Sequence, residues 1–181
     1  MITPLAFDDL APELRERLQP KVDRLGYLGD FFAFTGHQPA ALAAFIDFTE
    51  RLRDALPLRL TEVVALTVAA RTGNDYERVQ HERLSLANGC SEAWLRAVVA
   101  LDPDAPTELN SQEASVQRLV LAALAEYGNA AGDEFASVAD LLGPDATIAV
   151  LLTVGRYAAH ALIANVLGLA PPVESPIAAR T

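Results

Sequence analysis

Apolar residues recur along most of the chain at the three- and four-residue spacing of an amphipathic helix, and the alternation typical of strands is nearly absent. Helices are predicted over residues 11–25, 39–56, 58–71, 75–87, 91–101, 111–127, 133–142 and 145–167, and the irregular stretch after the first of them allows a short helix over 31–34. Pro20 should kink or divide the first helix because proline removes a backbone donor inside a helix. We therefore predict a single all-α domain over residues 1–181, with about seven or eight helices and a loose tail at 171–181.

Composition and charge narrow the functional classes. The chain has 181 residues, of which 51% are apolar, and this excludes a disordered polypeptide. Its 14 basic and 24 acidic residues give a net charge of −10. A nucleic-acid binder gathers Lys and Arg on one face, and an anionic membrane attracts basic segments. We therefore expect neither nucleic acid nor membrane as a partner.

Two further features bear on location. Residues 146–170 are the most apolar stretch, but the uninterrupted run before Arg156 is about ten residues, against the roughly 20 that a membrane span needs. We interpret it as a helix buried in a bundle. The N-terminal stretch lacks the basic start and apolar core of a secretory signal. Cys90 is the single cysteine, which excludes an internal disulfide, and we expect a cytoplasmic location.

The stretch TGNDYERVQHERLSLANG, residues 72–89, carries the most informative polar pattern. At about 100° per residue on a helix, Asn74, Glu77, His81 and Ser85 fall in one narrow stripe. An amide, a carboxylate, an imidazole and a hydroxyl thus share one face. On an outer surface such a face means little, so its neighbours decide its significance.

The preceding helix supplies a second acid. The segment LRLTEVVALTVAAR is apolar nearly all round, which predicts a helix buried on most faces, and Glu62 lies near its start. Burial disfavours the charged form of a carboxylate. In an antiparallel hairpin around Gly73, the depths of Glu62 and His81 differ by about 5 Å, so the two side chains can meet. A carboxyl group beside an imidazole is a candidate proton-transfer pair.

Each candidate also has a purely structural interpretation. Glu62 in a first helical turn favours the helix dipole, and His81 can pair with Glu77 on the same helix. Tyr76 is a candidate for substrate contact but is also a typical core residue. Cys90 precedes Ser91, a helix cap, where an apolar side chain commonly packs onto the first turn.

Other candidates have less support from the sequence than Glu62 and His81 do. They are the two remaining histidines, the phenylalanines and a metal site. His37, His160 and five phenylalanines, Phe31, Phe32, Phe34, Phe45 and Phe48, are interpreted as packing residues first. Glu62, Glu77 and His81 can be read as a carboxylate–histidine metal site, but the i,i+3 pairing of di-iron bundles is absent. We predict no metal and no cofactor.

The block LRLTEVVALTVAARTGNDYERVQHERLSLANGCSEAWLRAV resembles the carboxymuconolactone decarboxylase family, which includes the AhpD-like alkylhydroperoxidases. That family has a Glu in an apolar helix, a turn, a helix with C-x-x-C-x-x-x-H, then A-x-x-x-G and a short helix. Glu62, His81, Ala87 and Gly89 match this pattern in order and in approximate spacing. FFAFTGHQPAALAAFIDFTERL is similar to the family's lead-in helix, and GRYAAHALIANVLGL to its final one. The resemblance implies an AhpD-like bundle.

The departure from the family pattern concerns its chemistry. Both cysteines of the peroxidase branch are replaced, by Asn74 and Glu77, and neither side chain can attack a peroxide and close a disulfide. By resemblance, the branch without the dithiol binds small carboxylated or lactone-type metabolites and forms trimers or hexamers. The long apolar final helix also has more surface than one small bundle covers.

We therefore predict an acid–base enzyme of the decarboxylase or lyase type, acting on a small molecule within a homo-oligomer. Glu62 and His81 are the catalytic candidates, and Asn74, Glu77 and Tyr76 are the substrate-binding candidates. A non-catalytic oligomeric binding protein with the same fold is the alternative. A peroxidase-related protein using Cys90 is a further one.

Overall fold

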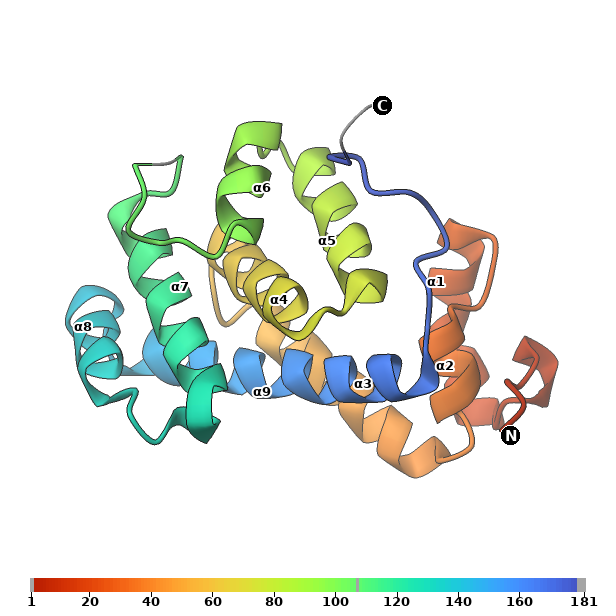
Figure 1. Ribbon diagram of the computed structural model, residues 1–181. Coiled ribbons are helices and arrows are strands. Elements are labelled where there is room, and N and C mark those ends of the chain that lie inside the picture. The colour runs from red at the N-terminus through yellow and green to blue at the C-terminus, as the bar shows by residue number, and fades with distance from the viewer. Residues whose placement is uncertain (1, 107, 179–181) are drawn as a thin grey trace. The chain divides into compact units, whose positions relative to one another are not determined.

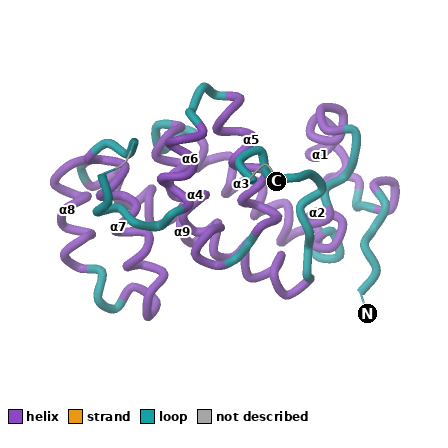
Figure 2. The backbone as a smooth tube through the Cα atoms, turned by 45° about the horizontal axis from the view of Figure 1, so that its top comes forward, coloured by secondary structure: helices purple, strands orange, loops and turns teal. Residues whose placement is uncertain are grey.

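The computed structural model describes residues 2–106 and 108–178, and every regular element within these ranges is a helix (Figure 2). The all-α prediction is confirmed, with nine α-helices and two short 3-10 helices among the described residues. The chain divides into two compact units, residues 1–51 and 52–181, where the sequence predicts one domain.

The first unit contains four elements, η1 (Phe7–Asp9), α1 (Pro12–Leu25), α2 (Asp30–Thr35) and most of α3 (Pro39–Arg53). Helix α1 continues through Pro20, so the expectation of a divided helix is wrong. Pro20 is exposed, and water can satisfy the carbonyl that the proline leaves without a donor. Phe31 packs against Phe32 and Phe45, with ring centroids 5.6 Å and 5.8 Å away, as expected of core residues.

The described residues of the second unit form six α-helices and one 3-10 helix. They are α4 (Leu58–Thr72), α5 (Asp75–Ala87), α6 (Glu92–Val99), α7 (Ser111–Leu124), η2 (Ala125–Gly128), α8 (Gly132–Leu142) and α9 (Pro144–Leu167). Helix α4 packs against α5, α6, α7 and α9, which surround it in Figure 1. All side chains from Glu62 to Ala69 are buried, as the all-round apolar pattern predicts. Helix α4 therefore forms the centre of this unit, and any polar group on it is held in the core.

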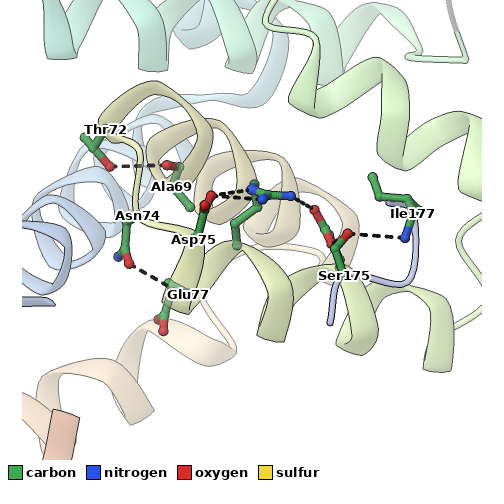
Figure 3. Close-up of polar contacts among 9 residues, drawn as sticks. Ala69, Thr72, Asn74, Asp75, Glu77, Ser175 and Ile177 are labelled. Carbon is green, nitrogen blue, oxygen red and sulfur yellow. Dashed lines mark hydrogen bonds and ion pairs between the residues drawn. The ribbon is translucent and has the colours of Figure 1, made fainter. Parts of the chain in front are cut away.

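The connection between α4 and α5 is a tight turn that fixes the register of the hairpin. Gly73 has φ +67°, in the left-handed region that glycine adopts without steric cost. The Asn74 side chain then caps α5 by accepting a hydrogen bond from the Glu77 backbone N–H at 3.3 Å (Figure 3). At the other end of α5, Gly89 has φ +86°, the left-handed conformation in which many helices end.

The C-terminal segment differs from the expectation of a loose tail. Ile177 is buried in the core cluster of the second unit, and its carbonyl accepts a hydrogen bond from Arg96 Nη1 at 3.0 Å. Ser175 Oγ donates to Glu82 Oε2 at 2.6 Å and accepts from the Ile177 backbone N–H, a turn drawn in Figure 3. Residues 175–177 are therefore held against α5 and α6, and positions 179–181 lie outside the described residues.

Helix α9 has two different faces. Of the helices described, it is the one with the length and apolar composition of a membrane span, but less than half of that window is buried. Thr153, Tyr157 and His160 face the core, whereas Leu162 and Val166 are exposed. The interpretation of this segment as a helix buried in a bundle therefore holds for one face alone.

Candidate functional site

Glu62 and His81 meet across the α4–α5 hairpin, as the count of residues from Gly73 predicts. His81 Nδ1 lies 2.9 Å from Glu62 Oε2, and Ser85 Oγ donates to the same oxygen at 3.0 Å. Glu62 is 1% exposed, and the His81 side chain retains 13% of its accessible surface. The contact is confirmed, and the imidazole is the member of the pair that reaches toward the surface.

Glu77 lies one turn before His81 and is surrounded by cationic groups. Arg156 Nη1 donates to Glu77 Oε1 at 2.7 Å, and His160 Nε2 lies 3.3 Å from Oε2. His81 Nε2 lies 3.6 Å from Glu77 Oε1, beyond normal hydrogen-bond length. Burial alone would raise the pKa of Glu77, but His160, Arg156 and His81 lower it well below its ordinary value of 4.5. Glu77 is therefore a carboxylate at neutral pH.

The environment of His81 favours its protonated form. Burial alone would lower the pKa of His81, but Tyr157 and the carboxylates Glu62 and Glu77 raise it well above its ordinary value of 6.5. Tyr157 also packs edge-on against the imidazole, with ring centroids 5.1 Å apart. His81 therefore favours the imidazolium form, which is a proton donor, and its Nδ1 contacts Glu62.

Asn74 and Tyr76 connect this cluster to α9. Asn74 Nδ2 lies 3.4 Å from His160 Nδ1, while its Oδ1 caps α5. The Tyr76 ring stacks on the His160 ring at 6.1 Å between centroids. All five predicted site residues therefore lie in one connected cluster, with Asn74 and Tyr76 bordering its His160 side.

Two members of the cluster are not predicted by the sequence pattern. Arg156 and His160 come from α9, 79 and 83 positions beyond Glu77, and their pairing with it depends on the packing of α9. The signal available is the spacing of these polar residues, four apart in an otherwise apolar helix, which places both on one face. The sequence interpretation of His160 as a packing residue first does not include this contact.

Cys90 lies outside this cluster. It is buried in the apolar core cluster with Trp94 and Leu95, in agreement with a packing role before the Ser91 cap. Burial raises the pKa of the Cys90 thiol. Because the thiolate is the reactive form, this environment disfavours peroxide chemistry.

His81 lies between Glu62 and Glu77, with one ring nitrogen toward each carboxyl group. In the part of the chain that the structure describes, no group of three or more His, Cys, Asp or Glu side chains is arranged to hold a metal ion. The chemistry that these residues can perform among themselves is proton transfer, with the imidazolium as donor and the Glu62 carboxylate as its partner.

Comparisons with known proteins address the family and the fold. The family model described as the Carboxymuconolactone decarboxylase family matches residues 39–115. Comparison with curated proteins gave no significant match. An alkylhydroperoxidase AhpD core structure, an uncharacterized peroxidase-related protein from Ralstonia eutropha, has 15% identity and a TM-score of 0.81 over 94% of this chain and 91% of that chain.

Two other solved structures are also similar. An AhpD-type protein of unknown function from Agrobacterium tumefaciens has 20% identity and a TM-score of 0.71, over 78% of this chain and 97% of that chain. A debrominase in complex with 2,3,4-tribromopyrrole has 16% identity and a TM-score of 0.79, over 94% and 90%. At these identities the likeness shows the fold. The chain has the AhpD-like fold, and its residues 39–115 match the model of the carboxymuconolactone decarboxylase family.

Proposed function

We propose that this protein is a carboxymuconolactone decarboxylase-like enzyme that uses Glu62 and His81 as an acid–base pair on a small carboxylated or lactone-type metabolite. The observation that carries the proposal is the 2.9 Å contact between the buried Glu62 carboxylate and His81 Nδ1. A buried ion pair is costly to desolvate, and Glu62 lies on α4, whose other buried side chains are apolar except for Thr67. This setting favours a functional role over a purely structural one.

The two residues have different roles in this proposal. Glu62 accepts from Nδ1 and fixes the orientation of the imidazole, as a carboxylate does in a triad. Nε2–H, whose distance to Glu77 exceeds that of a hydrogen bond, is then the group available to a substrate. His81 acts as the general acid, and Glu62 stabilises its charge before the proton leaves.

The reaction class follows from this proton donor. In decarboxylation, the bond between the carboxylate and its neighbouring carbon breaks, CO2 leaves, and the electron pair remains as an enolate-like anion. That carbon then takes the proton from His81 Nε2, and the imidazole regains a proton from water. The net change is one carboxylate and one proton converted to CO2 and a C–H bond, so the step needs no oxidant.

Asn74, Glu77 and Tyr76 are proposed to position the substrate. Glu77 holds Arg156 and His160 beside His81, and the Arg156 guanidinium favours an anionic substrate. Tyr76 stacks on His160 and so borders the same group of side chains. The proposal includes no metal or cofactor, and it places the enzyme in the cytoplasm as a homo-oligomer.

The alternative is a binding protein that keeps the same cluster without turnover. One observation favours this alternative. The contacts of Glu77 with Arg156, His160 and the Asn74 cap can account for its burial by a structural role alone. Such a protein would bind carboxylated ligands but release no CO2, whether or not His81 is present.

Carboxymuconolactone serves as the first test substrate, with CO2 release as the measured quantity. Loss of a general acid typically lowers rates by about 10²–10⁴-fold, so His81→Gln and Glu62→Gln should each lower kcat with a smaller effect on KM. Cys90→Ser is the matched control and should retain activity. Turnover that survives both site substitutions would contradict the proposal. Peroxide turnover with a thiol reductant that is lost in Cys90→Ser would favour the peroxidase-related alternative.

A further inference from the structure

The exposed side of α9 carries a regular row of apolar or small residues that the core does not use. Its members are Ile148, Leu152, Gly155, Ala159, Leu162 and Val166, which we call the α9 seam. The spacings alternate between four and three, so at about 100° per residue the six positions fall within a stripe of about 80°. This is the pattern by which one helix packs along another.

The seam is uncovered and uncharged. Ile148 and Leu152 are 49% and 46% exposed, and Leu162 and Val166 are 67% and 78% exposed. The seam extends for about 27 Å along the helix at 1.5 Å per residue. The charged residues of α9 lie off the seam, at Asp145 and at Arg156, which binds Glu77.

The order of large and small side chains in the seam is the same when it is read from either end. Small residues, Gly155 and Ala159, lie at its middle and larger apolar ones toward both ends. About a two-fold axis at position 157, Ile148 faces Val166 of a second copy, Leu152 faces Leu162, and Gly155 faces Ala159. A two-fold interface requires each patch to be complementary to itself, and this order satisfies that requirement. Small central residues also let two helix backbones approach closely at a crossing.

We infer that the α9 seam is an isologous contact between two copies of this chain, with the α9 helices antiparallel. The inference deepens the homo-oligomer part of the proposed function by naming the surface, and it does not depend on the acid–base chemistry. It requires an assembly with an even number of chains. A membrane surface fits the seam less well, because amphipathic membrane helices flank their apolar face with Lys and Arg.

The first experiment measures the mass of the full-length protein by light scattering after size exclusion. Leu152→Glu places a charge in the seam and should halve the mass of the assembly. Leu141→Glu on α8 is the matched control, since Leu141 is 45% exposed and lies outside the seam, and it should leave the mass unchanged. Circular dichroism and the thermal midpoint establish that both variants are folded.

The second experiment tests the antiparallel register with two oppositely charged variants. Leu152→Lys and Leu162→Glu should each have half the wild-type mass alone, and an equimolar mixture should recover the full mass. The antiparallel pairing places the new lysine opposite the new glutamate, whereas a parallel pairing with like positions opposed does not.

Three results would overturn the inference. They are a wild-type assembly with one chain or an odd number, an unchanged mass for folded Leu152→Glu, and a mixture that stays at half mass. Wild-type protein that is monomeric and binds vesicles of neutral phosphatidylcholine would assign the seam to a membrane instead. Because the readouts are mass and vesicle binding, failure here leaves the CO2-release test of the catalytic proposal unaffected.

Discussion

Replacement of Glu62 by glutamine removes the negative charge beside His81 while keeping a side chain of the same size. The glutamine amide oxygen can still accept from His81 Nδ1, so the substitution isolates charge from hydrogen bonding. In the wild type, Glu62 is one of the groups that raise the pKa of His81, through a contact of 2.9 Å. An opposite charge within this range typically displaces a pKa by about 1–3 pH units.

We therefore expect Glu62→Gln to lower the pKa of His81, because the substitution removes a negative charge that stabilises the imidazolium. Tyr157 and Glu77 remain and continue to raise it, while burial then acts against the charged imidazole. The His81 imidazolium would then lose its proton at a lower pH than in the wild type. The alkaline limb of the rate profile should move down by the same amount.

Heteronuclear NMR of the imidazole C–H groups measures this pKa directly. The chain has three histidines, so the His81 signal can be assigned by its loss in His81→Gln. Ser85→Ala is the matched control, because it removes a neutral donor to Glu62 and leaves the charge in place. A His81 midpoint that is the same in wild type and in folded Glu62→Gln would refute the electrostatic reasoning.

Further predictions concern the cluster around Glu77 and His81. Arg156→Ala leaves the buried Glu77 carboxylate without its closest cation and should lower the unfolding free energy, measured by urea denaturation, by about 3 kcal/mol or more. A loss below about 1 kcal/mol would mean that water solvates the ion pair. Asn74→Ala removes a helix cap and should cost about 1 kcal/mol, comparable with Ser91→Ala on α6, so a neutral result contradicts the capping role. Because the pKa of Glu77 is lowered in the folded state, its ion pairs stabilise the fold above pH 4.5 and are lost as pH falls through the folded-state pKa. The difference in unfolding free energy between wild type and Glu77→Gln should therefore hold down to pH 4.5 and shrink below it. A difference that vanishes near neutral pH would contradict this prediction. The raised pKa of His81 has the opposite sign, so its contribution is complete below pH 6.5 and is lost as pH rises through the folded value, which a base titration of the unfolding free energy measures.

Local signals explain why the helices and the central contact were predictable. The proline at position 57, the glycine at 73 and the Asn88–Gly89 pair mark helix ends through their own backbone preferences. Once Gly73 fixes the turn, the rise per residue determines that Glu62 and His81 lie at similar depth. This reasoning uses one hairpin and no distant contact.

The parts that sequence reasoning missed depend on distant contacts. The approach of Arg156 to Glu77 depends on how α9 packs on the α4–α5 hairpin, and no spacing within α5 encodes that packing. The same holds for Ser175, whose hydroxyl reaches Glu82 93 positions away. A tail rich in proline reads as loose because its stabilising partners lie in another part of the chain.

The origin of the proton added to the product tests the central claim most directly. Wild-type protein and His81→Gln would each convert carboxymuconolactone in D2O, and NMR would locate deuterium on the two faces of the new C–H carbon. An imidazolium held by Glu62 delivers its proton from one side, so the wild type should give deuterium on a single face, and His81→Gln should lose at least about 100-fold in rate. Deuterium distributed equally over both faces in the wild type, or an unchanged rate in His81→Gln, would contradict a role for His81 as the proton donor.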